Sequence, residues 1–249
     1  MKGFLLAAGD GTRLRPLTSH IPKCLVPIHG TPLLEVWLNW CGLYGIDEVL
    51  INTHAHRDMV RRFVEAYRGP IRITLTEEDD LLGSAGTVRV NRAFVEGEGE
   101  FAIMYADVLT NCRFDWIVEV HRRFSSPLTV GTYRVLNPTQ CGILVTDAQG
   151  KVTDFTEKPE CPKSDTAFTG IMVAGRTFLE ELPETLPADI GFHALPKFIN
   201  RMYAVPSAEY VIDIGTLEKY DQAQREWPGL QPVSWHDGAL PLQSAGSAK

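Results

Sequence analysis

The stretch GFLLAAGDGTRLRPLTSHIPKCLVPI, residues 3–28, joins an apolar strand pattern to a long loop that contains two glycines. Gly9 and Gly11 directly after a strand are typical of a nucleotide-binding turn, because glycine lets backbone amides approach a ligand closely. A dinucleotide-binding fingerprint also needs a third small residue and an acidic residue at the end of the next strand. Leu14 stands at the third position and the next strand ends in INTHAH, so a nicotinamide site is not indicated.

The same loop carries three cations, Arg13, Arg15 and Lys23. Pro16 and Pro22 disfavour helical backbone in the residues before them, so we expect this segment to be extended rather than helical. Flexible backbone followed by cations fits a polyphosphate, since backbone amides and arginine forks both bind phosphate oxygens. The segment therefore predicts a nucleoside triphosphate loop, and the alternative is an arginine-bearing surface loop.

The first half of the chain alternates apolar runs with segments of helical spacing. Strands are expected at 3–7, 48–53, 71–76 and 101–106, and helices at 32–45, 58–69 and 83–94. This βαβαβ order predicts an α/β fold with a Rossmann-like, mixed but mostly parallel sheet and helices on both faces.

From about residue 127 the sequence becomes rich in β-branched residues. Strands are expected at 127–135, 141–147, 151–158, 167–175 and 210–214, and helices at 176–182, 193–202 and 216–226. The turn residues DAQG at 147–150 predict a hairpin between two of these strands.

Charge, cysteine spacing and the N-terminal sequence indicate which binding partners and which cellular compartment to expect. The chain has 249 residues and a formal net charge of -7 with no long Lys and Arg block, so we expect no nucleic-acid partner. Its five cysteines lack CxxC spacing, which is typical of reduced thiols in a cytoplasmic protein. The apolar run at the N-terminus breaks at Gly9 and is too short for a signal peptide or a membrane span, so no membrane partner is expected.

Several motifs in order resemble one family. LAAGDGTRLRPLT at 6–18 with IPKCLVPI at 21–28 resembles the signature of the sugar-1-phosphate nucleotidyltransferases, which join a nucleoside triphosphate to a sugar 1-phosphate and release pyrophosphate. Further motifs of the same family follow in order: EEDDLLGSAGT at 77–87, YADVL at 105–109, CGILVTD at 141–147, FTEKPE at 155–160, FTGIMV at 168–173 and VIDIGTLEKY at 211–220. A set of motifs in the correct order is far more specific than a single motif.

The resemblance implies an enzyme of EC 2.7.7 type, acting on a nucleoside triphosphate and a sugar 1-phosphate with Mg²⁺ as cofactor. We expect one nucleotidyltransferase domain at 1–227, with a nucleotide-binding half at about 1–125 and a sugar-phosphate-binding half at about 126–227, then a C-terminal tail at 228–249. Some members carry a β-helix after this domain, which we do not expect here. The chain is expected to be a monomer or homodimer.

The resemblance also implies roles for individual residues. Arg13 would hold the departing pyrophosphate, Lys23 would contact nucleotide phosphate, and Asp107 with Asp213 would bind the metal. The implied nucleotide-binding residues are Leu6, Ala7, Ala8, Gly9, Gly11, Thr12, Arg13, Lys23, Glu77, Gly83, Ala85 and Gly86. The implied sugar-phosphate-binding residues are Gly142, Glu157, Lys158, Thr169 and Gly170. One departure is Ala106, where family members often have glycine before the metal-binding aspartate.

The base and the sugar are less sharply indicated. Glu77 and Glu78 precede LLGSAGT with no glutamine nearby, and a carboxylate accepts well from the two N–H donors of guanine. We therefore expect GTP with mannose 1-phosphate or a heptose 1-phosphate. Three alternatives stay open: a uridylyl- or thymidylyltransferase acting on a hexose or amino-sugar 1-phosphate, transfer to another phosphorylated small molecule such as phosphocholine, and a non-catalytic nucleotide-sugar sensor.

Overall fold

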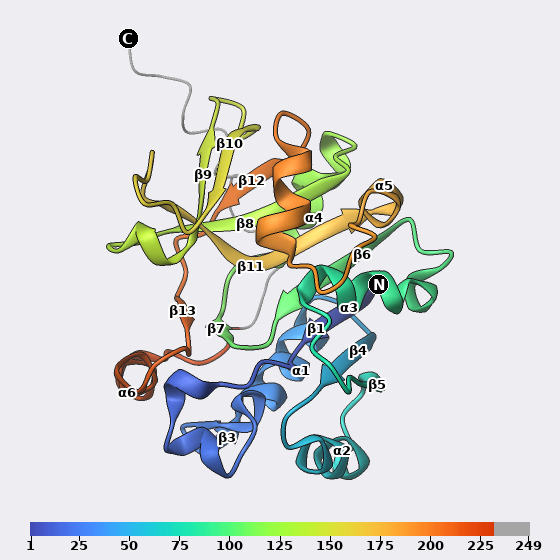
Figure 1. The fold of residues 1–249 in the computed structure, drawn as a ribbon, viewed down its shortest axis with the longest axis vertical. Coiled ribbons are helices and arrows are strands. Elements are labelled where there is room, and N and C mark those ends of the chain that lie inside the picture. The colour runs from blue at the N-terminus through green and yellow to red at the C-terminus, as the bar shows by residue number, and fades with distance from the viewer. Residues whose placement is uncertain (232–249) are drawn as a thin grey trace. The chain divides into compact units, whose positions relative to one another are not determined.

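The computed structural model describes residues 1–231, which form two compact units. The first unit contains Met1–Leu81, Ile103–Cys112 and the described chain from Glu209 onward. The second unit contains Leu82–Ala102 and Arg113–Ala208. The chain therefore leaves and re-enters the first unit twice, and each unit is described below by itself (Figure 1).

Parallel strands form the centre of the first unit. β1 (Lys2–Leu6), β4 (Glu48–Thr53) and β5 (Arg72–Glu77) pair side by side in parallel, with β4 in the middle. The helices α1 (Leu33–Leu43) and α2 (Arg57–Ala66) connect them. β4 is buried along almost its whole length, as a central strand covered on both faces should be. β6 (Glu100–Tyr105) ends in this unit, just before Asp107.

A small two-stranded sheet brings distant parts of the first unit together. β7 (Val108–Thr110) pairs antiparallel with β13 (Val211–Asp213), and Asp213 lies opposite Val108. α6 (Leu217–Glu226) follows, with Thr216 as its N-cap. A second short pair, β2 (Pro27–Ile28) and β3 (Thr31–Pro32), leads into α1. The sequence analysis did not predict β2, β3 or β7.

The glycine loop contains more regular secondary structure than expected. The prediction of extended backbone is correct at Arg15 and Pro22, with ψ of 143° and 147°. Between and around these residues, however, the chain forms three single 3₁₀ turns, at Thr12–Leu14, Leu17–Ser19 and Lys23–Leu25. A 3₁₀ turn needs only one i to i+3 hydrogen bond, so it fits between extended residues where a full α-helix does not.

The second unit is built on mainly antiparallel strands. β9 (Gly142–Thr146) and β10 (Val152–Glu157) form the hairpin that DAQG predicts, which stands out in Figure 1. β11 (Thr166–Gly175) pairs antiparallel with both β9 and β8 (Leu128–Arg134), and β12 (Tyr203–Pro206) pairs parallel with β8.

The helices of the second unit are short. They are α3 (Ser84–Val90), the 3₁₀ helix Arg92–Val95, α4 (Phe114–Arg123), the 3₁₀ turn Pro138–Gln140 and α5 (Arg176–Glu180). The helix predicted at 193–202 is wrong in type. A π-helical turn at Ile190–Ala194 runs into a 3₁₀ turn at Leu195–Phe198, where Pro196 lacks the backbone N–H that an α-helix would use.

Most predicted elements agree with the structure to within a few residues, and the expected mixed α/β fold class is confirmed. The sequence analysis missed α4 and β12. The expected C-terminal tail lies outside the described residues from 232 onward. Among the described residues, no helix is both long and apolar enough to cross a membrane.

The five cysteines all lie in the described part of the chain, and none of them forms a disulfide. Cys24, Cys41 and Cys112 are buried, as small apolar residues are, whereas Cys161 is exposed. Burial raises the pKa of the Cys24 thiol to about 12, so this group stays protonated at neutral pH.

Candidate active site

A buried lysine lies between two aspartates in the first unit. Lys23 has only 8% of its surface exposed, and its Nζ donates to Asp107 Oδ2 at 2.7 Å. The same Nζ lies 3.5 Å from Asp213 Oδ1. Burial acts to lower the pKa of Lys23, but attraction to the two carboxylates outweighs it and holds this pKa above its ordinary value. Lys23 is therefore a fixed cation and not a solvated surface charge.

Backbone pairing explains why the two aspartates meet. Asp107 directly precedes β7 and Asp213 ends β13, and Ile214 N donates to Asp107 O at 2.8 Å. Asp213 is not the cap of α6, because Thr216 Oγ1 accepts from the Lys219 backbone N–H instead. The side chain of Lys219 adds a second cation, with its Nζ 3.4 Å from Asp213 Oδ2.

The two carboxylates fit a divalent metal ion. Asp213 Oδ1 is buried and accepts no hydrogen bond, which leaves a lone pair available to a ligand. A Cβ on Gly215 would lie 2.7 Å from Asp213 Oδ2, so only glycine there leaves room for this carboxylate orientation. Mg²⁺ is typically held by one or two carboxylates together with phosphate oxygens and water. Within residues 1–231 no group of three or more His, Cys, Asp or Glu side chains forms a metal cluster.

The glycine loop lies against this centre. Gly11 has a φ of +63°, and its carbonyl accepts from Thr18 Oγ1 at 2.7 Å and from Leu14 N at 2.9 Å. A Cβ on Gly11 would approach Lys23 Cβ to 3.2 Å, so the loop packs closely on the lysine. Around Gly9, by contrast, a Cβ would meet nothing within 4 Å. The loop is thus tightly packed at Gly11, whereas there is free space beside the backbone at Gly9.

The other predicted residues of this loop extend from the end of β1. Ala7 N donates to Asn52 Oδ1 at 2.7 Å, and Leu6 O accepts from Ala106 N at 3.0 Å, so the strand end is fixed on both sides. Arg13 is exposed, and it lies close enough to Lys23 for the two cations to repel each other. The remaining predicted loop residues are Ala8, which is buried, and Thr12, which is exposed.

Two neighbouring glutamates at the end of β5 have different environments. Glu77 Oε1 accepts from Arg61 Nε at 3.0 Å and from Arg61 Nη2 at 2.6 Å, at the surface. Glu78 is only 4% exposed and accepts from Asn52 Nδ2 at 2.8 Å. Asn52 thereby links Glu78 to the backbone of Ala7 in the glycine loop. Glu77 was predicted as a nucleotide contact, yet Glu78 is the carboxylate connected to the loop.

A second candidate centre lies in the second unit, at the end of β10. Glu157 is paired across the hairpin with Gly142, and a Cβ on Gly142 would lie 2.6 Å from Glu157 Oε2. A Cβ on Gly191 would collide with the same oxygen. Burial raises the pKa of Glu157 above its ordinary value, while Lys158 lowers it and Asp189 raises it further. Two glycines therefore make room for one partly desolvated carboxylate.

Lys158 is held differently from Lys23. Its φ is +49°, a conformation that non-glycine residues seldom adopt, and its N–H donates to Cys141 O at 3.0 Å. The ammonium Nζ lies 5.7 Å from the centre of the Phe192 ring, within range of a cation–π interaction. Backbone strain of this kind is often found where a side chain must be aimed at a ligand.

Thr169 and Gly170 form a β-bulge in β11, where the register with β8 shifts. Gly170 has a φ of +81°, and Thr169 Oγ1 donates to Gly131 O at 3.0 Å while accepting from Ile171 N at 3.2 Å. The hydroxyl of Thr169 thus stabilises the bulge. Any contribution of this pair to a ligand site comes through the shape of the backbone.

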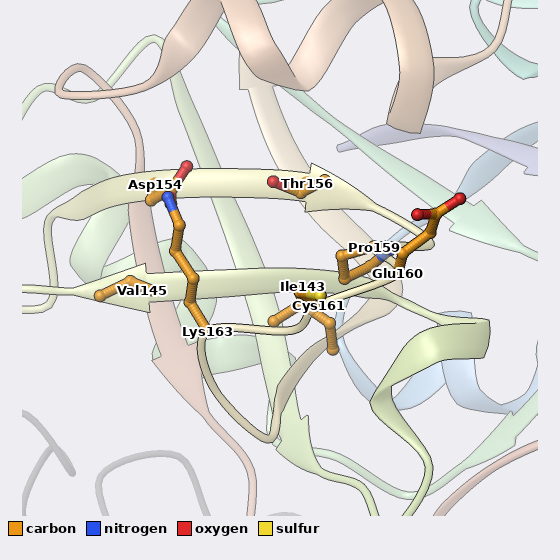
Figure 2. A pocket seen from close by; sticks show the side chains of 8 residues that line it. All are labelled: Ile143, Val145, Asp154, Thr156, Pro159, Glu160, Cys161 and Lys163. Atoms are coloured by element: carbon orange, nitrogen blue, oxygen red, sulfur yellow. The ribbon is translucent and has the colours of Figure 1, made fainter.

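The opposite face of the β9–β10 hairpin carries a separate pocket of about 230 Å³. Because side chains alternate along a strand, Thr156 faces this pocket, as Figure 2 shows, and Glu157 faces away from it. The pocket is lined by Ile143, Val145, Asp154, Thr156, Pro159, Glu160, Cys161 and Lys163. It is therefore distinct from the Glu157 centre.

The predicted nucleotide-binding residues Gly83, Ala85 and Gly86 pack against the chain segment around Ala188 in the second unit. Ala85 N and Gly86 N donate to Ala188 O at 2.9 and 3.0 Å, and Ala188 N donates to Leu82 O at 2.9 Å. Gly83 has a φ of +76°, and a Cβ there would collide with the Ala188 carbonyl. These predicted residues therefore also have a structural role, because they fix one segment to another.

Sequence reasoning missed several residues at or beside the two centres: Asn52, Gly191, Phe192, Gly215 and Lys219. A signal was present for Asn52, since a polar residue in an otherwise apolar strand indicates a specific partner. Nothing in the sequence alone distinguishes Glu78 from Glu77.

Comparison with known proteins agrees with this arrangement. The family model described as nucleotidyl transferase matches residues 2–228. The chain is 30% identical over 243 residues to a UTP–glucose-1-phosphate uridylyltransferase of Synechocystis sp., covering 90% of this chain. It is 28% identical over 227 residues to mannose-1-phosphate guanylyltransferase 1 of Arabidopsis thaliana, covering 88% of this chain. It spans 63% of the length of each of these relatives.

A solved structure of UDP-glucose pyrophosphorylase complexed with UDP-glucose has the same fold. The TM-score is 0.79 at 21% sequence identity, and the match covers 91% of this chain and 97% of the solved chain. The family match runs through both units and includes the lysine, the two aspartates and the glycine loop. The chain belongs to the nucleotidyl transferase family.

Proposed function

We propose that this chain is a sugar-1-phosphate nucleotidyltransferase, which joins a nucleoside triphosphate to a sugar 1-phosphate and releases pyrophosphate. The observation that carries the proposal is the buried Lys23, with its Nζ 2.7 Å from Asp107 and 3.5 Å from Asp213, next to a glycine loop. Two carboxylates and a fixed cation suit a reaction between two anions, in which charge neutralisation and positioning supply most of the catalysis.

The groups of the first unit would act on the triphosphate. A Mg²⁺ ion bound to Asp107 and Asp213 would neutralise phosphate charge. Lys23 would contact a phosphate oxygen at the reacting phosphorus, where negative charge increases as the new bond forms. Arg13, exposed beside Lys23, would bind the pyrophosphate as it leaves through the two-pronged hydrogen bonding that a guanidinium provides.

The groups of the second unit would hold the other substrate. Lys158 would bind the phosphate of the sugar 1-phosphate, and Glu157 would accept hydrogen bonds from sugar hydroxyls. Gly142 would leave room for the Glu157 carboxylate, and Thr169 with Gly170 would contribute through the shape of the bulge in β11. No general base is required, since a phosphate monoester oxygen is already a nucleophile at neutral pH.

For the base, we propose guanine, read by the buried Glu78. Both oxygens of a carboxylate can accept hydrogen bonds, which suits the N1–H and N2–H donors of guanine. Glu77 is a weaker candidate, because its carboxylate lies at the surface beside Arg57 and Arg61, whereas Glu78 is linked through Asn52 to the glycine loop. The relatives include a uridylyltransferase as well as a guanylyltransferase, so a uracil-reading site is the second candidate.

A substrate panel tests the proposal. Pyrophosphate release is measured with GTP, UTP, dTTP and ATP, each against mannose, heptose and glucose 1-phosphates, with and without Mg²⁺. We expect the highest kcat/KM for GTP with mannose or heptose 1-phosphate, and loss of turnover on chelation of the metal. A preference for UTP or dTTP would overturn the guanine assignment alone, whereas no release with any pair would overturn the proposed reaction.

A further inference from the structure

We propose that the π-helical turn Ile190–Ala194 couples the nucleotide-binding segment to the sugar-phosphate groups, with Ser84 as a positioning residue for the sugar 1-phosphate. The inference rests on the proposed function and deepens it. Every residue that carries it belongs to the second unit.

One end of the coupling is a set of hydrogen bonds at the start of α3. Ser84 Oγ accepts from Ile190 N at 2.7 Å and donates to Asp189 Oδ1 at 3.2 Å. The Ala188 carbonyl accepts from the backbone N–H groups of Ala85 and Gly86. The segment that contains the predicted nucleotide-binding residues Gly83, Ala85 and Gly86 is therefore hydrogen-bonded to residues 188–190 through both side chain and backbone.

The other end of the coupling contacts the sugar-phosphate centre. Gly191 packs against the Glu157 carboxylate so closely that a Cβ there would collide with it. The next residue, Phe192, has 51% of its surface exposed and places its ring 5.7 Å from Lys158 Nζ. Two consecutive residues of the turn thus contact the two charged groups that we assign to the sugar 1-phosphate.

The turn itself is closed by a histidine. The backbone N–H of Asp189 donates to His193 Nδ1 at 2.9 Å, and His193 N donates to Asp189 O at 2.9 Å. π-helical turns are rare in proteins, and many of those that do occur lie at functional sites. Because both ends of the turn are joined in this way, a shift of Ser84 would be transmitted to Gly191 and Phe192 rather than absorbed between them.

The test compares the Michaelis constants of the two substrates in Ser84→Ala. This variant keeps the backbone bonds of Ala188 but loses both side-chain bonds. We expect the KM for sugar 1-phosphate to rise about tenfold, as loss of two hydrogen bonds would predict. The KM for the triphosphate should change by less than about twofold. A residue that served only the nucleotide or only the fold would not produce this split.

Two further variants make the test specific. Ser84→Thr keeps a hydroxyl and should restore the KM for sugar 1-phosphate. Phe192→Leu alters an exposed side chain, so the protein should fold, and it should raise the same KM through the loss of the ring beside Lys158. Thermal unfolding of each variant confirms that the comparison is between folded proteins.

The outcomes separate this inference from the proposed function. If Ser84→Ala raises the KM for the triphosphate alone, or changes neither constant while the wild type is active, the coupling is overturned and the proposed reaction stands. If Phe192→Leu leaves the KM for sugar 1-phosphate unchanged, the turn does not position Lys158. If the wild type releases no pyrophosphate with any substrate pair, both the reaction and the coupling fail.

Discussion

The two charged centres are built in opposite ways. The Lys23 centre of the first unit consists of groups of opposite charge, in which the buried Lys23 ammonium is paired with the partly exposed carboxylates of Asp107 and Asp213. In the second unit, the Glu157 centre consists of a carboxylate that fits only because Gly142 and Gly191 lack side chains. The first centre therefore depends on charge balance, whereas the second depends on space.

This difference predicts which substitutions matter at each centre. Removing one carboxylate charge leaves the buried Lys23 ammonium with only one partner, which is costly even when the shape is kept. Adding one methyl group at Gly142 or Gly191 displaces the Glu157 carboxylate without changing any charge. The predictions below use these two kinds of change.

The largest effect is expected for Asp107→Asn. The variant keeps the shape of the side chain but removes the charge that pairs with Lys23 and the oxygen that would bind metal. We expect kcat to fall by about 10²–10³, as for loss of a preorganised electrostatic contact. Pyrophosphate release measures the rate, and Asp47→Asn, at a side chain that is 61% exposed and paired with the N-terminal ammonium, is the matched control. An unchanged kcat would refute the proposed role of Asp107.

The second prediction adds bulk beside Glu157. Gly142→Ala would place a Cβ 2.6 Å from Glu157 Oε2 and 2.9 Å from the Phe155 ring, so the carboxylate must move. We expect the KM for sugar 1-phosphate to rise by about tenfold, in line with loss of one or two hydrogen bonds. Gly99→Ala is the control, because a Cβ there meets nothing within 4 Å. If both variants behave alike, the glycine does not shape the site.

The third prediction distinguishes the two neighbouring glutamates. In Glu78→Gln the amide oxygen can still accept from Asn52, while the NH₂ group can donate to a base carbonyl. We expect the ratio of kcat/KM for GTP to that for UTP to fall by about tenfold, equivalent to one hydrogen bond of altered polarity. Glu77→Gln should leave this ratio unchanged. If Glu77→Gln lowers this ratio and Glu78→Gln does not, Glu77 is the residue that contacts the base.

The smallest effect is a pH dependence of stability. Because burial raises the pKa of Glu157 in the folded protein, the folded state binds more protons than the unfolded state above the ordinary pKa of 4.5. The Glu157 contribution to the free energy of unfolding therefore falls as pH rises from 4.5 through the raised pKa. Lys158 and Asp189 are the charged groups that act on it.

Denaturant unfolding of the wild type and Glu157→Gln at a series of pH values measures this contribution. The stability of the variant relative to the wild type should increase with pH across that interval. A difference that is constant with pH would mean that the pKa of Glu157 is not raised by folding.

The amino-acid sequence by itself determined the local framework. The apolar runs predicted β1, β4, β5 and β6, DAQG predicted the β9–β10 hairpin, and the order of motifs indicated the family. These features depend on residues close together in the chain, where side-chain periodicity and turn chemistry act directly. The helix expected at 193–202 was wrong in type because Pro196 lacks the backbone N–H that an α-helix would use. The π turn just before it is held by Ser84, about a hundred residues earlier, which no local pattern indicates.

Only the tertiary structure decided which side chains meet. Lys23 and Asp107 are 84 residues apart, and Asn52 and Glu78 are 26 apart, so no local pattern could pair them. The same holds for Gly191 beside Glu157 and for the choice between Glu77 and Glu78. Burial and electrostatic pairing depend on what the rest of the chain places around a residue. The sequence therefore indicated the main charged residues of each centre. The tertiary structure decided which residues they contact and how far their pKa values shift.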